Sequence, residues 1–170
     1  MVRIGFVGTG GIAAHHMDQL KKVEDVKIVA LCDIVEERAR DSAARFGGKA
    51  YADHRQMLDA EKLDALYVCV PPFAHTDAEI LAVRKGIQLF VEKPVTLDPD
   101  LGLRILGEIR KSGILSSVGY SLRYTPAARA MRGFLKDNSI AMVTSNRWGG
   151  VPETPWWRVM EQSGGQLVEQ

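Results

Sequence analysis

The sequence lacks the features that are typical of disulfide-rich, metal-binding, membrane-spanning and exported proteins. Its 170 residues include two cysteines, Cys32 and Cys69, which are too few for a disulfide framework and lack the spacing of a metal site. No apolar run approaches the roughly 20 residues that a membrane span requires. The beginning, MVRIGFVGTG, is too short and too rich in glycine for an export signal. We therefore expect a cytoplasmic protein whose two thiols stay reduced in the core.

An excess of charge is also lacking. Lysine and arginine number 22 against 21 acidic residues, which leaves a formal net charge of +1. Proteins that bind nucleic acid or anionic membranes usually carry a basic surface, and this balance does not indicate one. Hydrophobic residues make up 46% of the chain and charged residues 25%, as is usual for a soluble globular protein. The sequence therefore predicts a small-molecule partner, with no nucleic acid and no membrane.

The first 120 residues alternate between short apolar runs and helical patterns. The predicted strands are 2–8, 26–33, 65–71, 87–92 and 114–120. The predicted helices are 11–22, 35–46, 53–60, 74–86 and 98–112, with Asp53 and Asp98 as N-caps. Most of the apolar runs are continuous, as in parallel strands that are buried on both faces. The pattern predicts an α/β fold with a doubly wound parallel Rossmann sheet over residues 1–120.

The pattern changes in residues 121–170. An amphipathic helix is predicted at 125–138 and a strand of a new sheet at 140–150. A lone strand does not make a stable sheet. We therefore expect these residues to be the truncated start of an incomplete second domain, an α/β open-sheet domain for substrate and oligomerisation.

A glycine-rich motif lies between the first predicted strand and the first predicted helix. FVGTGGIAAHH places Gly8, Gly10 and Ala13 in the arrangement G-x-G-x-x-[GA], with Gly11 beside them. Gly8 permits a tight turn, Gly10 lets the backbone approach a pyrophosphate, and Ala13 lets the helix pack closely on the strand. The N–H groups and the dipole at the helix N-terminus attract phosphate. The motif predicts a dinucleotide site.

An acidic residue, Asp33, ends the second predicted strand, 20 residues beyond Ala13. At this position a carboxylate accepts hydrogen bonds from the adenosine ribose hydroxyls and repels a 2′-phosphate, which favours NAD over NADP. No basic residue follows until Arg38. The alternative is a purely structural glycine turn with Asp33 as a helix cap.

A charged pair followed by proline, Glu92-Lys93-Pro94, ends the fourth of these strands. Ligands of open α/β sheets bind outside the carboxyl ends of the strands, where the segments 70–72 and 92–94 would both lie. A lysine beside a nicotinamide ring can hydrogen-bond a substrate hydroxyl and stabilise the developing alkoxide. The alternative is a surface lysine that extends from the strand end into water.

Four segments in this order resemble the glucose–fructose oxidoreductase and inositol dehydrogenase family. They are VGTGGIA, PPFAH (71–75), VEKP (91–94) and GYSLRYTP (119–126), and PWWRVMEQSGGQLVEQ resembles the stretch ahead of the family's catalytic histidine. The resemblance implies an NAD-dependent oxidoreductase that transfers hydride at a secondary carbon of a sugar, polyol or related small molecule. It also implies a homo-oligomer when the protein is full length.

The resemblance assigns roles to individual residues. It implies a cofactor site made by Gly8, Gly10, Gly11, Ala13 and Asp33, with Pro71, Pro72 and His75 along the nicotinamide half. Lys93 is then the catalytic lysine, and Glu92 contacts the cofactor or orients that lysine. Tyr120 and Arg123 lie where the family approaches cofactor or substrate, and Tyr124 is a candidate for a domain interface.

The resemblance implies that the family's catalytic histidine would follow Gln170, so we expect these 170 residues to hold the cofactor half and the lysine without it. By the same resemblance, Glu169 takes roughly the position of an acid that precedes this histidine. Two other functions therefore stay open. Some relatives use tightly held NAD to cleave glycosidic bonds by transient oxidation. A non-catalytic NAD-sensing module is the other.

Several further residues invite a functional interpretation. Adjacent histidines point in different directions on a helix, so we expect one of His15 and His16 to pack inward and the other to face solvent, without a metal. His54 is expected to have no partner. Trp148, Trp156 and Trp157 are either a sugar-stacking wall or interface residues, and we favour the interface.

Overall fold

The computed structural model describes residues 1–146, 148–150 and 152–169. Six parallel strands form one sheet in the order β3-β2-β1-β4-β5-β6. The strands are β1 (Val2–Val7), β2 (Val26–Cys32), β3 (Lys49–Tyr51), β4 (Ala65–Val68), β5 (Gln88–Val91) and β6 (Ser116–Val118). This order confirms the predicted Rossmann sheet, because the chain reverses direction across the sheet between β3 and β4.

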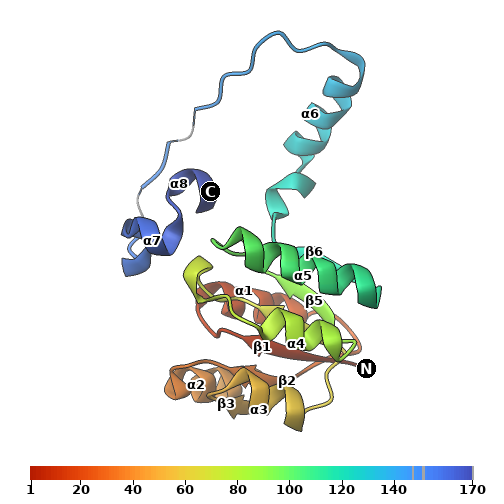
Figure 1. The fold of residues 1–170 in the computed structure, drawn as a ribbon, viewed down its shortest axis with the longest axis vertical. Coiled ribbons are helices and arrows are strands. Elements are labelled where there is room, and N and C mark those ends of the chain that lie inside the picture. The colour runs from red at the N-terminus through yellow and green to blue at the C-terminus, as the bar shows by residue number, and fades with distance from the viewer. Residues whose placement is uncertain (147, 151, 170) are drawn as a thin grey trace.

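Helices cover both faces of the sheet (Figure 1). They are α1 (Gly11–Leu20), α2 (Glu36–Phe46), α3 (His54–Ala60), α4 (Ala78–Arg84) and α5 (Pro99–Ser112). Side chains of α1 and α2 join one core cluster, and side chains of α3, α4 and α5 join the other. Asp53 and Asp98 accept hydrogen bonds from the first turns of α3 and α5, as expected of N-caps.

Two parts of the sheet region differ from the expectation. The strand β3 was not predicted, because its sequence, Lys49-Ala50-Tyr51, contains no apolar run. The helix expected at 74–86 begins only at Ala78, after a 3₁₀ turn η1 (Pro72–Ala74). Pro72 opens this 3₁₀ turn, because proline is tolerated in the first turn of a helical segment, where its missing N–H has no partner to bond.

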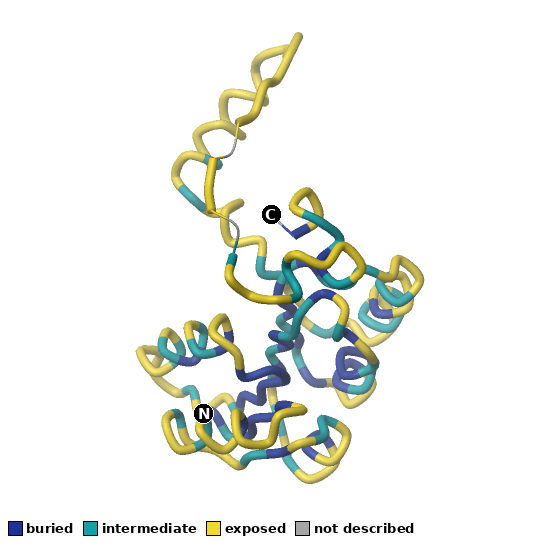
Figure 2. Tube along the Cα trace, turned by 90° about the vertical axis from the view of Figure 1, so that its left-hand side faces the viewer, coloured by how far each residue is buried: buried dark blue, intermediate teal, exposed yellow. Residues whose placement is uncertain are grey.

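The last part of the chain is helical, with long irregular connections. Its elements are η2 (Ser121–Tyr124), α6 (Pro126–Asp137), η3 (Pro155–Arg158), α7 (Met160–Ser163) and α8 (Gln166–Glu169). Figure 1 shows α6 projecting away from the sheet, and Figure 2 shows that this arm is almost wholly exposed. The chain then returns, and η3, α7 and α8 lie beside the sheet region.

A strand was predicted at 140–150. It does not form at 140–146 or 148–150, and Arg147 lies outside the described residues. An extended segment needs a partner strand for its backbone groups, and no strand follows β6 in the described residues. In the described part of the chain, no helix is both long and apolar enough to cross a membrane.

Candidate functional site

A groove of about 1170 Å³ runs along the carboxyl ends of the strands. Eight of the predicted site residues line it, namely Gly8, Gly10, Gly11, Asp33, Pro71, His75, Glu92 and Lys93. Seven of them lie in the segments that directly follow β1, β2, β4 and β5, and Gly11 is the first residue of α1. The order of the sheet therefore brings together residues that are up to 85 positions apart in the sequence.

Three predicted residues lie outside the lining of this groove. Ala13 is fully buried beneath the glycine loop, where its small side chain lets α1 pack on the sheet. Pro72 is buried in η1. Arg123 lines a separate, smaller pocket that shares Lys93 with the groove.

The glycine loop has the shape of a phosphate cradle. Gly8 has φ +85, and a Cβ there would lie 2.4 Å from the backbone oxygen of Cys69, so a larger residue does not fit. A Cβ at Gly10 or Gly11 would meet nothing within 4 Å, because these residues face the open groove. The loop thus leaves the N-terminus of α1 accessible to an anionic ligand.

The Asp33 carboxylate fastens this loop to the end of β2. Its Oδ2 accepts hydrogen bonds from the backbone N–H and the hydroxyl of Thr9, both at 3.0 Å. Its Oδ1 accepts one from the N–H of Val35 at 2.9 Å. The structural alternative thus holds in part, since the carboxylate supports the loop and the turn before α2. The residue also lines the groove, so both roles fit its position.

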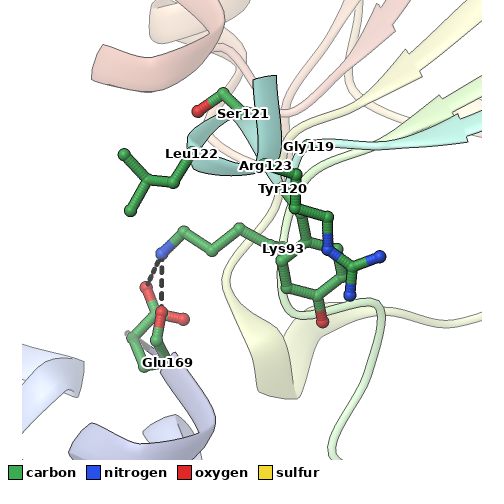
Figure 3. Close-up of a pocket in the computed structure, with 7 residues that line it drawn as sticks. All are labelled: Lys93, Gly119, Tyr120, Ser121, Leu122, Arg123 and Glu169. Carbon is green, nitrogen blue, oxygen red and sulfur yellow. Dashed lines mark hydrogen bonds and ion pairs between the residues drawn. The ribbon is translucent and has the colours of Figure 1, made fainter. Parts of the chain in front are cut away.

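Lys93 lies where the groove meets the smaller pocket, and its side chain points to the last helix. Its Nζ donates to the Glu169 carboxylate at 2.9 Å and to the Glu169 backbone oxygen at 2.8 Å (Figure 3). The sequence left the role of Glu169 open, and the structure places this acid against the lysine. The smaller pocket measures about 220 Å³ and is lined by Lys93, Gly119, Tyr120, Ser121, Leu122, Arg123 and Glu169.

The neighbouring Glu92 is buried and firmly held. His16 Nε2 donates to its Oε1 at 2.6 Å, and the backbone N–H of Lys93 donates to its Oε2 at 3.0 Å. Burial by itself would raise the pKa of Glu92, but the hydrogen bonds from His16 and Lys93 and their charges lower the pKa below its ordinary value. The carboxylate is therefore ionised at neutral pH. Sequence analysis did not find the contact with His16, because the two residues are 76 positions apart.

His75, which was expected along the nicotinamide half, lines the groove and forms a fully buried pair with Glu79. His75 Nδ1 and Glu79 Oε1 lie 2.5 Å apart. The second ring nitrogen of His75 and Glu79 Oε2 have no hydrogen-bond partner within the described residues. A buried polar atom without a partner is costly, so these atoms mark a place where a bound ligand or water can complete the bonding.

The other histidines follow the expectation in one case and contradict it in the other. His15 is exposed and His16 packs inward, as expected. His54 was expected to have no partner, and this is wrong. Its Nε2 lies 2.9 Å from Asp77, which also accepts from Arg55 at 2.7 Å. The order of the sheet brings α3 beside α4, which sequence spacing does not reveal.

The cysteines agree with the expectation of reduced thiols in the core, whereas the tryptophans lie in different surroundings. Cys32 ends β2 and Cys69 directly follows β4, the two strands that flank β1. Both thiols are free and buried, and burial raises the pKa of the Cys32 thiol to about 12. Trp148 is 92% exposed. Trp156 stacks on Trp157 with ring centres 6.2 Å apart, and Trp156 lines the groove.

Comparison with known proteins supports this description. Residues 2–120 match the GFO/IDH/MocA family, described as an oxidoreductase family with an NAD-binding Rossmann fold. The myo-inositol 2-dehydrogenase of Thermotoga maritima is 26% identical over 140 residues, which are 82% of this chain and 42% of that protein. The chain thus spans about two fifths of the length of this relative.

Two solved structures share the fold. The WlbA dehydrogenase of Chromobacterium violaceum, in complex with NADH and UDP-GlcNAcA, has a TM-score of 0.74 at 23% identity, covering 79% of this chain and 39% of that one. A variant of KijD10, a 3-ketoreductase of Actinomadura kijaniata, in complex with TDP-benzene and NADP, has a TM-score of 0.70 at 25% identity. The match covers 79% of this chain and 43% of that one.

Proposed function

Because this chain belongs to the GFO/IDH/MocA oxidoreductase family, we propose that it is the NAD-binding part of a dehydrogenase that acts on a sugar, a polyol or a related small molecule. The observation that carries the proposal is the meeting of Lys93 and Glu169 at the end of the groove that begins at the glycine loop. One groove thus combines a cradle for a dinucleotide with a cationic and an acidic group that can move a proton.

The groove suits a dinucleotide because its parts match the parts of the ligand. The N-terminus of α1, with Gly10 and Gly11, would hold the pyrophosphate. Asp33 would accept hydrogen bonds from the adenosine ribose, and its charge would disfavour a 2′-phosphate. We therefore propose NAD as the preferred cofactor, although the related structures include complexes with NADH and with NADP.

The chemistry at the other end of the groove is a proton transfer coupled to hydride transfer. NAD, when bound, supplies the group that takes up or returns the hydride. The Lys93–Glu169 pair would take up the proton of the substrate hydroxyl during oxidation and return it during reduction. Glu92 and His75 would shape the cofactor's nicotinamide end, with Pro71 and Pro72 forming the adjoining wall. Arg123, beside Lys93 in the smaller pocket, would contact the substrate.

We further propose that residues 121–170 belong to a second domain that completes the substrate site in the intact protein and joins it into a homo-oligomer. Three features support this. The helix α6 exposes its apolar side chains, the smaller pocket is open, and the chain spans 42% of the inositol dehydrogenase that it resembles. Sugars and inositols are the proposed substrate class because the inositol dehydrogenases among the relatives act on such compounds.

Calorimetric titration of the chain with NADH and NADPH tests the cofactor assignment. NADH is expected to bind about tenfold more tightly, and Asp33→Asn is expected to remove most of this preference by neutralising the carboxylate. The unfolding midpoint of the variant is measured in parallel. A lower midpoint would show that the glycine loop has lost its hydrogen bonds to Asp33, and an unchanged midpoint would show that only the charge has been removed. Tighter binding of NADPH would contradict the role of Asp33, and no binding of either nucleotide would contradict the proposed site.

A turnover assay of the intact protein with a panel of inositols and sugars tests the proposed lysine. Lys93→Ala is expected to lower kcat by about 10²-fold, the usual scale for the loss of acid–base assistance, while NADH binding stays within about twofold. Turnover that survives the substitution would show that Lys93 does not transfer the proton.

A further inference from the structure

His16 lies between two parts of the site without lining either pocket. It belongs to α1, whose N-terminus forms the glycine loop, and it contacts Glu92, which directly precedes Lys93. The described lining of the groove and of the smaller pocket includes Glu92 and Lys93, but His16 is not part of it. Its hydrogen bond to Glu92 therefore links His16 directly to a residue that lines the groove.

The ring of His16 is held by an aromatic ladder on the sheet. Phe6, Tyr67 and Phe90 face one another across β1, β4 and β5, with centroid distances of 4.9 and 4.6 Å between successive rings. His16 packs on this ladder, 5.6 Å from the ring of Tyr67 and 5.0 Å from that of Phe90. The ring thus has little freedom to turn, and its Nε2 is aimed at Glu92.

The carboxylate of Glu92 is confined on its other sides as well. Its Oε2 accepts from the N–H of Lys93, which fixes the backbone from which the lysine side chain starts. A Cβ at Gly119 would lie 2.9 Å from the carboxyl group, so the chain after β6 closes over it. A charged group with two hydrogen bonds in a buried position resists displacement, because breaking one bond leaves it partly unpaired.

We propose that His16 is a positioning residue that acts through Glu92 to hold the backbone at Lys93 in place relative to the glycine loop. A chain of contacts then runs from the pyrophosphate end of the groove, along α1 through His16 and Glu92, to the lysine. This inference rests on the proposed function in one respect, namely that the nicotinamide half of the cofactor lies beside Lys93.

Hydrogen exchange and ligand binding together test the proposal in the 170-residue chain. His16→Ala is expected to speed exchange of the Lys93 amide about tenfold beyond any change in global stability, since a hydrogen bond to a charged group is lost. The same variant is expected to weaken NADH about fivefold, and to leave ADP-ribose, which lacks the nicotinamide, within about twofold. His16→Gln keeps a donor and is expected to restore both values towards those of the unchanged protein.

The adjacent residue provides the matched control. His15→Ala removes an exposed imidazole from the same turn of α1 and is expected to change neither quantity. Unchanged exchange at Lys93 in His16→Ala would overturn the proposal, as would equal weakening of NADH and ADP-ribose, because a general loss of structure affects both ligands.

Two further results keep the inference separate from the proposed function. If the unchanged chain binds neither nucleotide, the cofactor assignment fails. Exchange of the Lys93 amide then still decides whether His16 holds the backbone at Lys93. If His16→Ala does not fold, a double-mutant cycle of His16→Phe, which keeps an aromatic ring on the ladder but removes the hydrogen-bond donor, and Glu92→Gln takes its place. Non-additive effects on Lys93 exchange would support the coupling, and additive effects would overturn it.

Discussion

Residues 2–118 and residues 121–169 differ in how they use their apolar side chains. The sheet region buries them, and every buried hydrophobic residue of the described chain lies between Ile4 and Ile105. The second region contains a well-formed amphipathic helix, α6, with Thr125 as its N-cap. Its large apolar side chains are nevertheless exposed. Local signals are thus enough to form a helix, whereas burial requires a second surface that is complementary to it.

The two regions contact each other near Lys93 and η1, at the edge of the groove. The Lys93–Glu169 contact is the one ion pair between them in the described part of the chain. The helix α7 also packs near η1. These contacts place α8 at the end of the groove, so the more loosely packed region supplies an acidic group to the tightly packed one. Its position depends on few contacts, which makes it the more easily disturbed of the two.

The largest expected effect contrasts two phenylalanines. Phe6→Ala removes a side chain that is 0% exposed and is expected to lower the free energy of unfolding by about 3–5 kcal/mol, through lost burial and the cavity that remains. Phe134→Ala, at a side chain that is 65% exposed, is expected to change it by less than about 0.5 kcal/mol. Urea unfolding measures both. Similar losses in the two variants would show that α6 is buried in solution and would remove the contrast.

An intermediate effect is expected where the regions meet. Glu169→Ala removes the carboxylate that holds Lys93, so tryptic cleavage at the exposed Arg158 is expected to accelerate about three- to tenfold, as the loss of about 1 kcal/mol implies. The midpoint of global unfolding is expected to stay unchanged. Glu161→Ala, at an exposed position of α7, is the control. Equal cleavage of the two variants would mean that the ion pair does not hold the segment.

The smallest expected effect is a dependence on pH. The folded state lowers the pKa of Glu92 from its ordinary value of 4.5, so the unfolded chain binds this proton more readily. The stability that Glu92 contributes is therefore fully present above pH 4.5 and is lost as the pH falls through the lowered pKa. Unfolding midpoints between pH 6 and 3 are expected to fall less steeply in Glu92→Gln. The same slope in both proteins would contradict the shift.

Much of the sheet region could be predicted from local patterns. Continuous apolar runs indicated five of the six strands, and the capping residues Asp53 and Asp98 marked two helix starts. The strand β3 contains no apolar run and was missed. The strand expected at 140–150 was wrong in its described residues, because local apolar character does not provide a partner strand. Apolar runs therefore predict a strand correctly where the chain also supplies the strand that pairs with it.

The sequence by itself indicated the Rossmann sheet and the glycine loop followed by Asp33, through the order of its apolar runs and the spacing of its glycines. The resemblance to the family pointed to Lys93, whose catalytic role stays a prediction. Only the tertiary structure decided the contacts of His16 with Glu92 and of Glu169 with Lys93, and the partner of His54. The reason is physical. Packing helices on a parallel sheet brings strand ends and helix faces together across 23 to 76 positions, and no local pattern records such distances.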